Sequence, residues 1–202
     1  MGDSPRVGVL ALQGDVREHA AMLRGLGADV ELVRRPAELD RVDGLVIPGG
    51  ESTTIDKLSR LFGLAEPIRS RIADGMPVFG TCAGLIMLAD RLEDAPADQR
   101  TFGGLDVTVR RNAFGGQNES FEIDLDMPTV ADRPVHAVFI RGPVVSSVGP
   151  AANVLAALPD GRVVAVEQGS LLGISFHPEV AGETGMHAHF LERVRAAASA
   201  AA

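Results

Sequence analysis

A single cysteine marks the segment of this 202-residue chain that is best suited to covalent chemistry. Cys82 lies in a Gly-Thr-Cys-Ala-Gly segment at residues 80 to 84, directly after the apolar run at residues 77 to 79. A nucleophile between small residues, where a strand gives way to a helix, is typical of an elbow that exposes one side chain above a sheet. The flanking glycines leave room where the strand and the helix nearly touch. The segment therefore predicts a thiol nucleophile that attacks a carbonyl carbon.

The second motif with chemical potential is His177-Pro178-Glu179, which follows the apolar stretch at residues 171 to 176. A histidine near the thiol can take its proton and later return it to a departing amine. A carboxylate two residues further on can bind the other imidazole nitrogen and select the useful tautomer. Since Cys82 also begins a predicted helix, the helix dipole favours its thiolate. Cys82, His177 and Glu179 are thus the candidate catalytic residues.

Backbone amides are the expected donors to the negative oxygen that forms when a thiolate adds to a carbonyl. The amide of Ala83 comes directly after the nucleophile. A second donor is expected from the Gly49-Gly50 turn, because glycine lets the backbone approach a substrate closely. Gly50 and Ala83 are therefore predicted to form an oxyanion hole.

The first half of the chain contains the elements that must position these residues. Strands are expected at residues 6–12, 29–33, 44–47 and 76–79. Helices are expected at residues 52–62, 64–74 and 83–92, and a further helix is expected to begin after Asp15, which should cap it. Alternating strands and helices predict a three-layer, doubly wound, mostly parallel α/β sheet with helices on both faces. Sites in such sheets lie at the carboxyl ends of the strands, where the proposed chemical motifs occur.

The second half of the chain is richer in short β segments, separated by Gly, Pro and Asn. Strands are expected near residues 105–110, 121–125, 135–140 and 154–158, then a hairpin of 162–166 with 171–176, and a last helix over 186–198. These segments predict a small antiparallel β extension. With no internal repeat and no linker, residues 1 to 202 are expected to form a single domain.

Composition excludes several classes of partner. The net charge is −8 and the chain lacks Trp and Tyr, so neither a basic stripe nor an aromatic platform for nucleic acid is expected. No apolar run approaches the roughly 20 residues that cross a bilayer, so no membrane association is expected. The lone cysteine and the absence of a signal-peptide pattern favour a cytoplasmic protein.

The other histidines are interpreted as structural residues. His187 and His189 are two positions apart, so they do not share a helix face, and no metal site is expected from them. They are expected at the surface or in packing contacts. His19 and His136 are also interpreted as structural, with His19 near the site because it follows the first strand.

The three chemical motifs, with Pro-Gly-Gly-Glu-Ser-Thr at residues 48 to 53 as the third, resemble those of the triad-type (class I) glutamine amidotransferases. Further segments extend the resemblance to the glutaminase subunits of pyridoxal 5′-phosphate synthase. They are residues 12 to 19, 48 to 54, Arg111-Asn112-Ala113-Phe114-Gly115 and Phe139-Ile140-Arg141-Gly142-Pro143. Because these segments follow one another along nearly the whole chain, the resemblance is highly specific.

The resemblance implies that the chain hydrolyses L-glutamine to L-glutamate and ammonia through a thioester on Cys82, without a cofactor. Ammonia would pass to a synthase subunit that makes pyridoxal 5′-phosphate from ribose 5-phosphate and glyceraldehyde 3-phosphate, and whose docking activates the glutaminase. By the same resemblance, His177 and Glu179 complete a triad, and Gln13 lies near the oxyanion loop and the partner interface. Substrate contacts are implied for Gly50, Glu51, Ser52, Arg111, Ile140 and Arg141. Gly116 and Gly142 depart from the usual arginine and alanine of the family, away from the proposed triad.

Two other functions use a similar elbow. One is another amidotransferase subunit, such as that serving imidazole glycerol phosphate synthesis, which does not usually carry Pro-Gly-Gly-Glu-Ser-Thr-Thr together with Phe-Ile-Arg-x-Pro. The other is a cysteine hydrolase, or a redox or chaperone protein with an elbow thiol, which would not require His177 and Glu179. A glutaminase assay with and without the cognate synthase, in which pyridoxal 5′-phosphate formation is followed, separates the resemblance-based function from that of another amidotransferase subunit.

Overall fold

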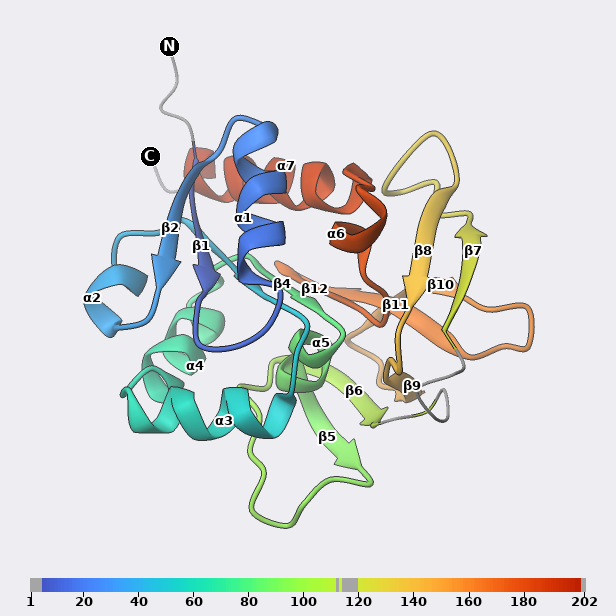
Figure 1. The fold of residues 1–202 in the computed structure, drawn as a ribbon, viewed down its shortest axis with the longest axis horizontal. Helices are drawn as coiled ribbons and strands as arrows, with labels where there is room; N and C mark the ends of the chain where they lie inside the picture. Colours follow the sequence, from blue (N-terminus) through green and yellow to red (C-terminus); the bar gives the residue numbers. More distant parts are fainter. Residues whose placement is uncertain (1–4, 112, 114–119, 201–202) are drawn as a thin grey trace.

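A computed structural model describes residues 5–111, 113 and 120–200 (Figure 1). Five neighbouring strands form a parallel half-sheet in the order β2-β1-β3-β4-β12. Their bounds are β2 Asp29–Val33, β1 Arg6–Leu10, β3 Gly44–Ile47, β4 Val78–Thr81 and β12 Leu171–Ile174.

The sheet continues beyond β12 with mostly antiparallel pairs. Its further strands, in spatial order, are β11 Val163–Gln168, β9 Val144–Val148, β6 Leu105–Arg110 and β5 Ala89–Glu93. Strand β10 Asn153–Ala157 also pairs with β11. A separate antiparallel ribbon joins β7 Phe121–Leu125 to β8 Val135–Phe139. These strands confirm the expected antiparallel extension.

Helices cover both faces of the parallel half-sheet (Figure 1). One face carries α1 Val16–Gly25 and α7 Gly185–Ala200, and the other carries α3 Ser52–Leu61, α4 Ala65–Ala73 and α5 Ala83–Leu88. Two short helices, α2 Pro36–Leu39 and α6 Pro178–Ala181, follow β2 and β12. This arrangement confirms the predicted three-layer α/β fold.

Strand β3 shows why two cores form. Leu45 and Ile47 pack into the core beneath α3, α4 and α5, whereas Val46 packs into the core beneath α1 and α7. Successive side chains of a strand point to opposite faces, so a strand covered on both sides must be apolar throughout. All four residues of β3 are buried.

Several predicted boundaries were wrong. The helix expected over residues 83–92 ends at Leu88, and Ala89 turns to an extended conformation (φ −67°, ψ 138°). Residues 89–93 form β5, which pairs in parallel with β6. Pairing to another segment overrides the helix propensity of this stretch. Strand β4 begins at Val78 instead of Met76 and runs through Thr81, while β9, α2 and α6 were not predicted.

Asp15 also differs from its predicted role. It stands directly before α1, but its side chain makes no capping hydrogen bond. Its carboxylate is directed elsewhere, toward the candidate site. Within the described part of the chain, no helix combines the length and apolarity required to span a membrane.

Candidate active site

The candidate site lies where four adjacent parallel strands end. Strands β1, β3, β4 and β12 are neighbours, so their carboxyl ends meet at one edge of the sheet. The segments that follow them hold Gln13 and Asp15, Gly50 and Glu51, Cys82, and His177. The fold therefore brings together residues that are distant in the sequence, such as Gln13 and His177, which are 164 positions apart.

Cys82 occupies a strained elbow between β4 and α5. Its backbone has φ 49° and ψ −101°, a conformation that L residues seldom adopt. Its amide donates a 2.8 Å hydrogen bond to the carbonyl oxygen of Ile174, which ties the elbow to β12. Cys82 as a whole residue is only 8% exposed. The elbow thus holds a free thiol in one orientation at the sheet edge.

The glycines on either side of Cys82 are required by close backbone packing. A Cβ atom on Gly80 would lie 2.5 Å from the carbonyl carbon of Gly84. A Cβ atom on Gly84 would lie 2.1 Å from the carbonyl oxygen of Ile47. Both distances are far below a van der Waals contact, as the elbow motif predicts.

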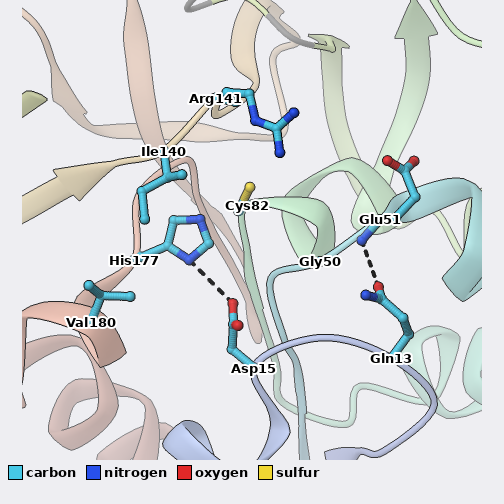
Figure 2. Close-up of a pocket in the computed structure, with 9 residues that line it drawn as sticks. All are labelled: Gln13, Asp15, Gly50, Glu51, Cys82, Ile140, Arg141, His177 and Val180. Atoms are coloured by element: carbon cyan, nitrogen blue, oxygen red, sulfur yellow. Dashed lines mark hydrogen bonds and ion pairs between the residues drawn. The ribbon is translucent and has the colours of Figure 1, made fainter. Parts of the chain in front are cut away.

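His177 is held between β12 and α6 by its backbone and by its ring. Its amide donates to the carbonyl oxygen of Val138 at 2.9 Å, and its Nδ1 lies 2.7 Å from Oε1 of Glu179. Both side chains are buried. With Nδ1 bound to the carboxylate, the ring presents its other nitrogen toward Cys82 and Arg141 (Figure 2).

The charge state of His177 follows from its neighbours. Burial lowers the pKa of the imidazole, but hydrogen bonds with Asp15, Cys82 and Glu179 outweigh burial and raise that pKa to about 12. The site therefore favours a protonated imidazole. A cation beside a cysteine stabilises its thiolate, which is the nucleophilic form.

A cavity of about 410 Å³ opens over the thiol. Figure 2 shows the Cys82 sulfur, the His177 ring and the Arg141 guanidinium around one space. The volume lies in the range of small-molecule sites. The lining residues are Gln13, Asp15, Gly50, Glu51, Cys82, Ile140, Arg141, His177 and Val180.

Most of the predicted site residues line this cavity, but Ser52, Ala83, Arg111 and Glu179 do not; Glu179 lies behind His177, to which it is bound. Ser52 is buried and accepts a 3.0 Å hydrogen bond from Nε2 of Gln99. Arg111 donates to Oε1 of Glu51 at 3.0 Å and to Oε1 of Gln99 at 2.9 Å. Ala83 is buried at the start of α5.

Gln13 packs directly against the Gly49-Gly50 turn. Its Oε1 accepts a 2.6 Å hydrogen bond from the amide of Glu51. Gly50 has φ 152°, and a Cβ atom there would lie 2.3 Å from the same Oε1. The side chain of Gln13 thus fixes the turn that was expected to offer an oxyanion donor.

Asp15 and Val180 also line the cavity, although neither was predicted from the sequence as a site residue. Oδ2 of Asp15 lies 3.5 Å from Nδ1 of His177. The sequence could have indicated Asp15, because it follows β1 as Cys82 follows β4, and sites in parallel sheets form at the carboxyl ends of strands. Of the segment at residues 111 to 115 that carried part of the resemblance, Asn112, Phe114 and Gly115 lie outside the described residues, as does Gly116.

The remaining histidines divide into buried and exposed ones. His19 and His187 are fully buried and in contact with each other, whereas His189 is partly buried and contacts Arg193. His136 is exposed between Asp124 and Glu122. His187 was expected either at the surface or in packing contacts, and the structure shows it in packing contacts.

Asp15, His177 and Glu179 present ligand-type atoms within 4.8 Å of one another. A metal ligand must be a neutral imidazole, since binding requires a free nitrogen lone pair. The raised pKa of His177 works against that state. The group is better suited to proton transfer than to holding a cation.

Comparison with known proteins identifies the family of this chain. A model of the SNO glutamine amidotransferase family matches residues 9–196. A pyridoxal 5′-phosphate synthase subunit PdxT from Clavibacter michiganensis is 68% identical over 193 residues, covering 96% of this chain and 92% of the relative. The protein of the same name from Leifsonia xyli is 66% identical over 194 residues, covering 96% and 98%.

Solved structures agree with this assignment. A crystal structure of a glutamine amidotransferase superposes with a TM-score of 0.87 at 46% identity, covering 94% of this chain and 98% of the other. The structure of PurLQS from Thermotoga maritima has a TM-score of 0.70 at 17% identity, covering 96% of this chain and 97% of the other, and shows the shared fold alone. The chain belongs to the SNO glutamine amidotransferase family.

Proposed function

We propose that this glutamine amidotransferase is the glutaminase subunit of a pyridoxal 5′-phosphate synthase and hydrolyses L-glutamine to L-glutamate and ammonia. The observation that carries the proposal is the arrangement of His177, with Nδ1 2.7 Å from Glu179 and its ring interacting with Cys82. The family match and the relatives named as synthase subunits support the substrate and the partner.

In the first half of the reaction, the Cys82 thiolate attacks the side-chain amide carbon of glutamine. The oxygen that becomes negative accepts hydrogen bonds from the backbone amides of Gly50 and Ala83. Protonated His177 gives its proton to the departing nitrogen, so the C–N bond breaks as ammonia leaves. A γ-glutamyl thioester remains on Cys82.

In the second half, water replaces ammonia. Neutral His177 takes a proton from the water as its oxygen attacks the thioester carbon. The C–S bond then breaks, and glutamate and the Cys82 thiolate–imidazolium pair are released. Glu179 supports both halves because its carboxylate holds Nδ1 and stabilises the imidazolium.

Substrate recognition is assigned to the polar groups at the far side of the cavity. Arg141 lines the cavity, and its planar guanidinium suits a carboxylate of free glutamine. Gly50, Glu51 and Ile140 also line it. Ser52 follows Glu51 in the chain and Arg111 donates to Glu51 at 3.0 Å, so we propose that these two residues contribute to glutamine binding through Glu51.

The ammonia acceptor is assigned to a separate synthase subunit, which makes pyridoxal 5′-phosphate from ribose 5-phosphate and glyceraldehyde 3-phosphate. Gln13 is the proposed link between partner docking and the oxyanion turn, because it lies in the cavity and holds the amide of Glu51. We further propose that residues 1–202 act as one glutamine amidotransferase domain in the cytoplasm.

The test is a glutaminase assay with and without the cognate synthase, followed by measurement of pyridoxal 5′-phosphate. Glutamine-dependent product formation, and faster glutamate release with the synthase present, are expected. Equal formation of product with and without this chain, when glutamine is the only nitrogen source, would reject the proposed function.

A further inference from the structure

A pair of buried histidines lies directly behind the candidate triad and has no part in the proposed mechanism. Nδ1 of His19, in α1, lies 2.8 Å from Nε2 of His187, in α7. Nε2 of His19 lies 3.1 Å from Oγ1 of Thr81, the residue before the nucleophile. His19, His187 and Thr81 each have 0% exposure.

The same Nε2 atom of His19 faces the carboxylate of the triad. Oε1 of Glu179 is bound by His177, but Oε2 is buried and receives no hydrogen bond from any described residue. Nε2 of His19 lies 3.6 Å from Oε2, slightly beyond hydrogen-bond distance. A buried carboxylate oxygen without a donor is costly, so the group facing it decides how firmly the carboxylate is held.

The protonation of the pair is set by its surroundings. Burial lowers the pKa of His19 well below its ordinary value, and the neighbouring His187 and His177 lower it further. Burial lowers the pKa of His187 to about 4. Both imidazoles are therefore neutral near pH 7, and each carries one N–H group.

Only one arrangement of these two N–H groups avoids a buried donor without a partner. Nδ1 of His187 is buried and has no hydrogen-bond partner among the described residues. If Nδ1 of His187 carried the proton, a donor would be left unsatisfied, and His19 would turn a bare lone pair toward a carboxylate. With the proton on Nε2 of His187, that N–H donates to Nδ1 of His19. His19 then carries its proton on Nε2, toward Thr81 and Glu179.

From this geometry we propose that His19 is a positioning residue of the triad. Its Nε2–H lies between Oγ1 of Thr81 at 3.1 Å and Oε2 of Glu179 at 3.6 Å, and its positive end attracts the carboxylate and keeps it turned toward His177. His187 fixes the tautomer of His19 that makes this possible. The inference rests on the proposed glutaminase function, in which Glu179 orients His177.

The expected consequence is a loss of rate without a loss of substrate affinity. Without the N–H group of His19, Oε2 of Glu179 faces no donor from the residues that the structure describes, so the carboxylate holds His177 less firmly in its orientation toward the thiol. His19 is not among the residues that line the cavity, so it is not expected to touch glutamine. The effect should therefore appear in kcat and leave KM nearly unchanged.

Three variants of His19 distinguish a positioning role from a packing role. Their glutaminase kinetics are measured in the complex with the synthase subunit. His19→Leu removes both ring nitrogens. His19→Gln keeps an N–H donor near the place of Nε2, toward Glu179, whereas His19→Asn keeps one near the place of Nδ1, toward His187. We expect kcat to fall about tenfold in the Leu and Asn variants and to recover most of that loss in the Gln variant, with KM within about twofold.

A double-mutant cycle with Glu179→Gln supplies a readout that a packing role would not move. If His19 acts through Glu179, His19→Leu costs about tenfold in the wild-type background and nearly nothing in the Glu179→Gln background. Equal losses in both backgrounds, or equal kcat in the Gln and Asn variants, would overturn the proposal. Melting temperatures of all variants identify any loss that is due to unfolding. A wild-type complex without glutaminase activity would instead refute the proposed function, so the two failures are distinguishable.

Discussion

Oδ2 of Asp15 lies 3.5 Å from Nδ1 of His177, the same nitrogen that contacts Glu179 at 2.7 Å. Two carboxylates from different strand ends thus face one imidazole nitrogen. The side chain of Asp15 is 40% exposed, whereas that of Glu179 is fully buried. The partly solvated carboxylate adjusts the charge of the imidazole, and the buried one fixes its orientation.

Replacing Asp15 with Asn should move the pH dependence of glutamine hydrolysis. The hydrogen bond with Asp15 is among the interactions that raise the pKa of His177 above its ordinary value. Without the charge, the imidazolium loses its proton at lower pH, so the alkaline fall of kcat/KM, expected near pH 12 in the wild type, should shift downward by about 1 pH unit or more. Asp74→Asn serves as the control, because Asp74 is an exposed carboxylate that does not line the cavity. Superimposable profiles for wild type and the Asp15 variant would refute this role.

Replacing Gly84 with Ala should destabilise the fold. The added Cβ would lie 2.1 Å from a backbone oxygen of β3, so the elbow or the strand must move. A free energy of unfolding lower by about 1–3 kcal/mol is expected in denaturant titrations. Gly25→Ala, within α1, is the matched control, because a Cβ there meets nothing within 4 Å. That control should be neutral or stabilising by up to about 1 kcal/mol.

His187 should contribute to loss of stability in mild acid. Burial lowers its pKa from 6.5 to about 4 in the folded state, so between these values the unfolded chain binds a proton that the folded chain does not. Stability is then complete above about pH 6.5 and falls as the pH drops toward 4, by up to about 3 kcal/mol. His19 acts in the same direction, because burial lowers its pKa too.

The measurement is the melting temperature of wild type and His187→Gln between pH 7.5 and about pH 4. The variant should lose less stability on acidification than wild type. His136→Gln is the contrasting variant, since Asp124 and Glu122 raise the pKa of that exposed histidine. Parallel curves for wild type and His187→Gln would show that His187 does not titrate on unfolding.

Local patterns were sufficient to predict the parallel half-sheet and the elbow. Strand β3 is short, apolar and followed at once by Pro48 and two glycines, so its nature and its end can be read from adjacent residues. The same is true of Cys82, since the need for glycine on both sides is a local steric requirement. The family resemblance, which rested on such motifs, was confirmed by the comparisons.

Features that depend on distant contacts could not be predicted in this way. Residues 89–93 have helix-forming composition, but they pair with β6. An aspartate before a helix has the same sequence appearance whether it caps the helix or faces a histidine 162 positions away, as Asp15 does with His177. The contact between His19 and His187 joins helices from opposite ends of the chain, which no local pattern encodes.

The most direct test of the proposed mechanism is to search for the thioester on Cys82. Acid-quenched complex, mixed with glutamine, should yield a γ-glutamyl adduct that peptide mass spectrometry maps to the peptide containing Cys82. The Cys82→Ser variant should remain folded, yet show neither the adduct nor ammonia release above background. Wild-type rates of ammonia release from that variant, or an adduct on another residue, would show that Cys82 is not the nucleophile.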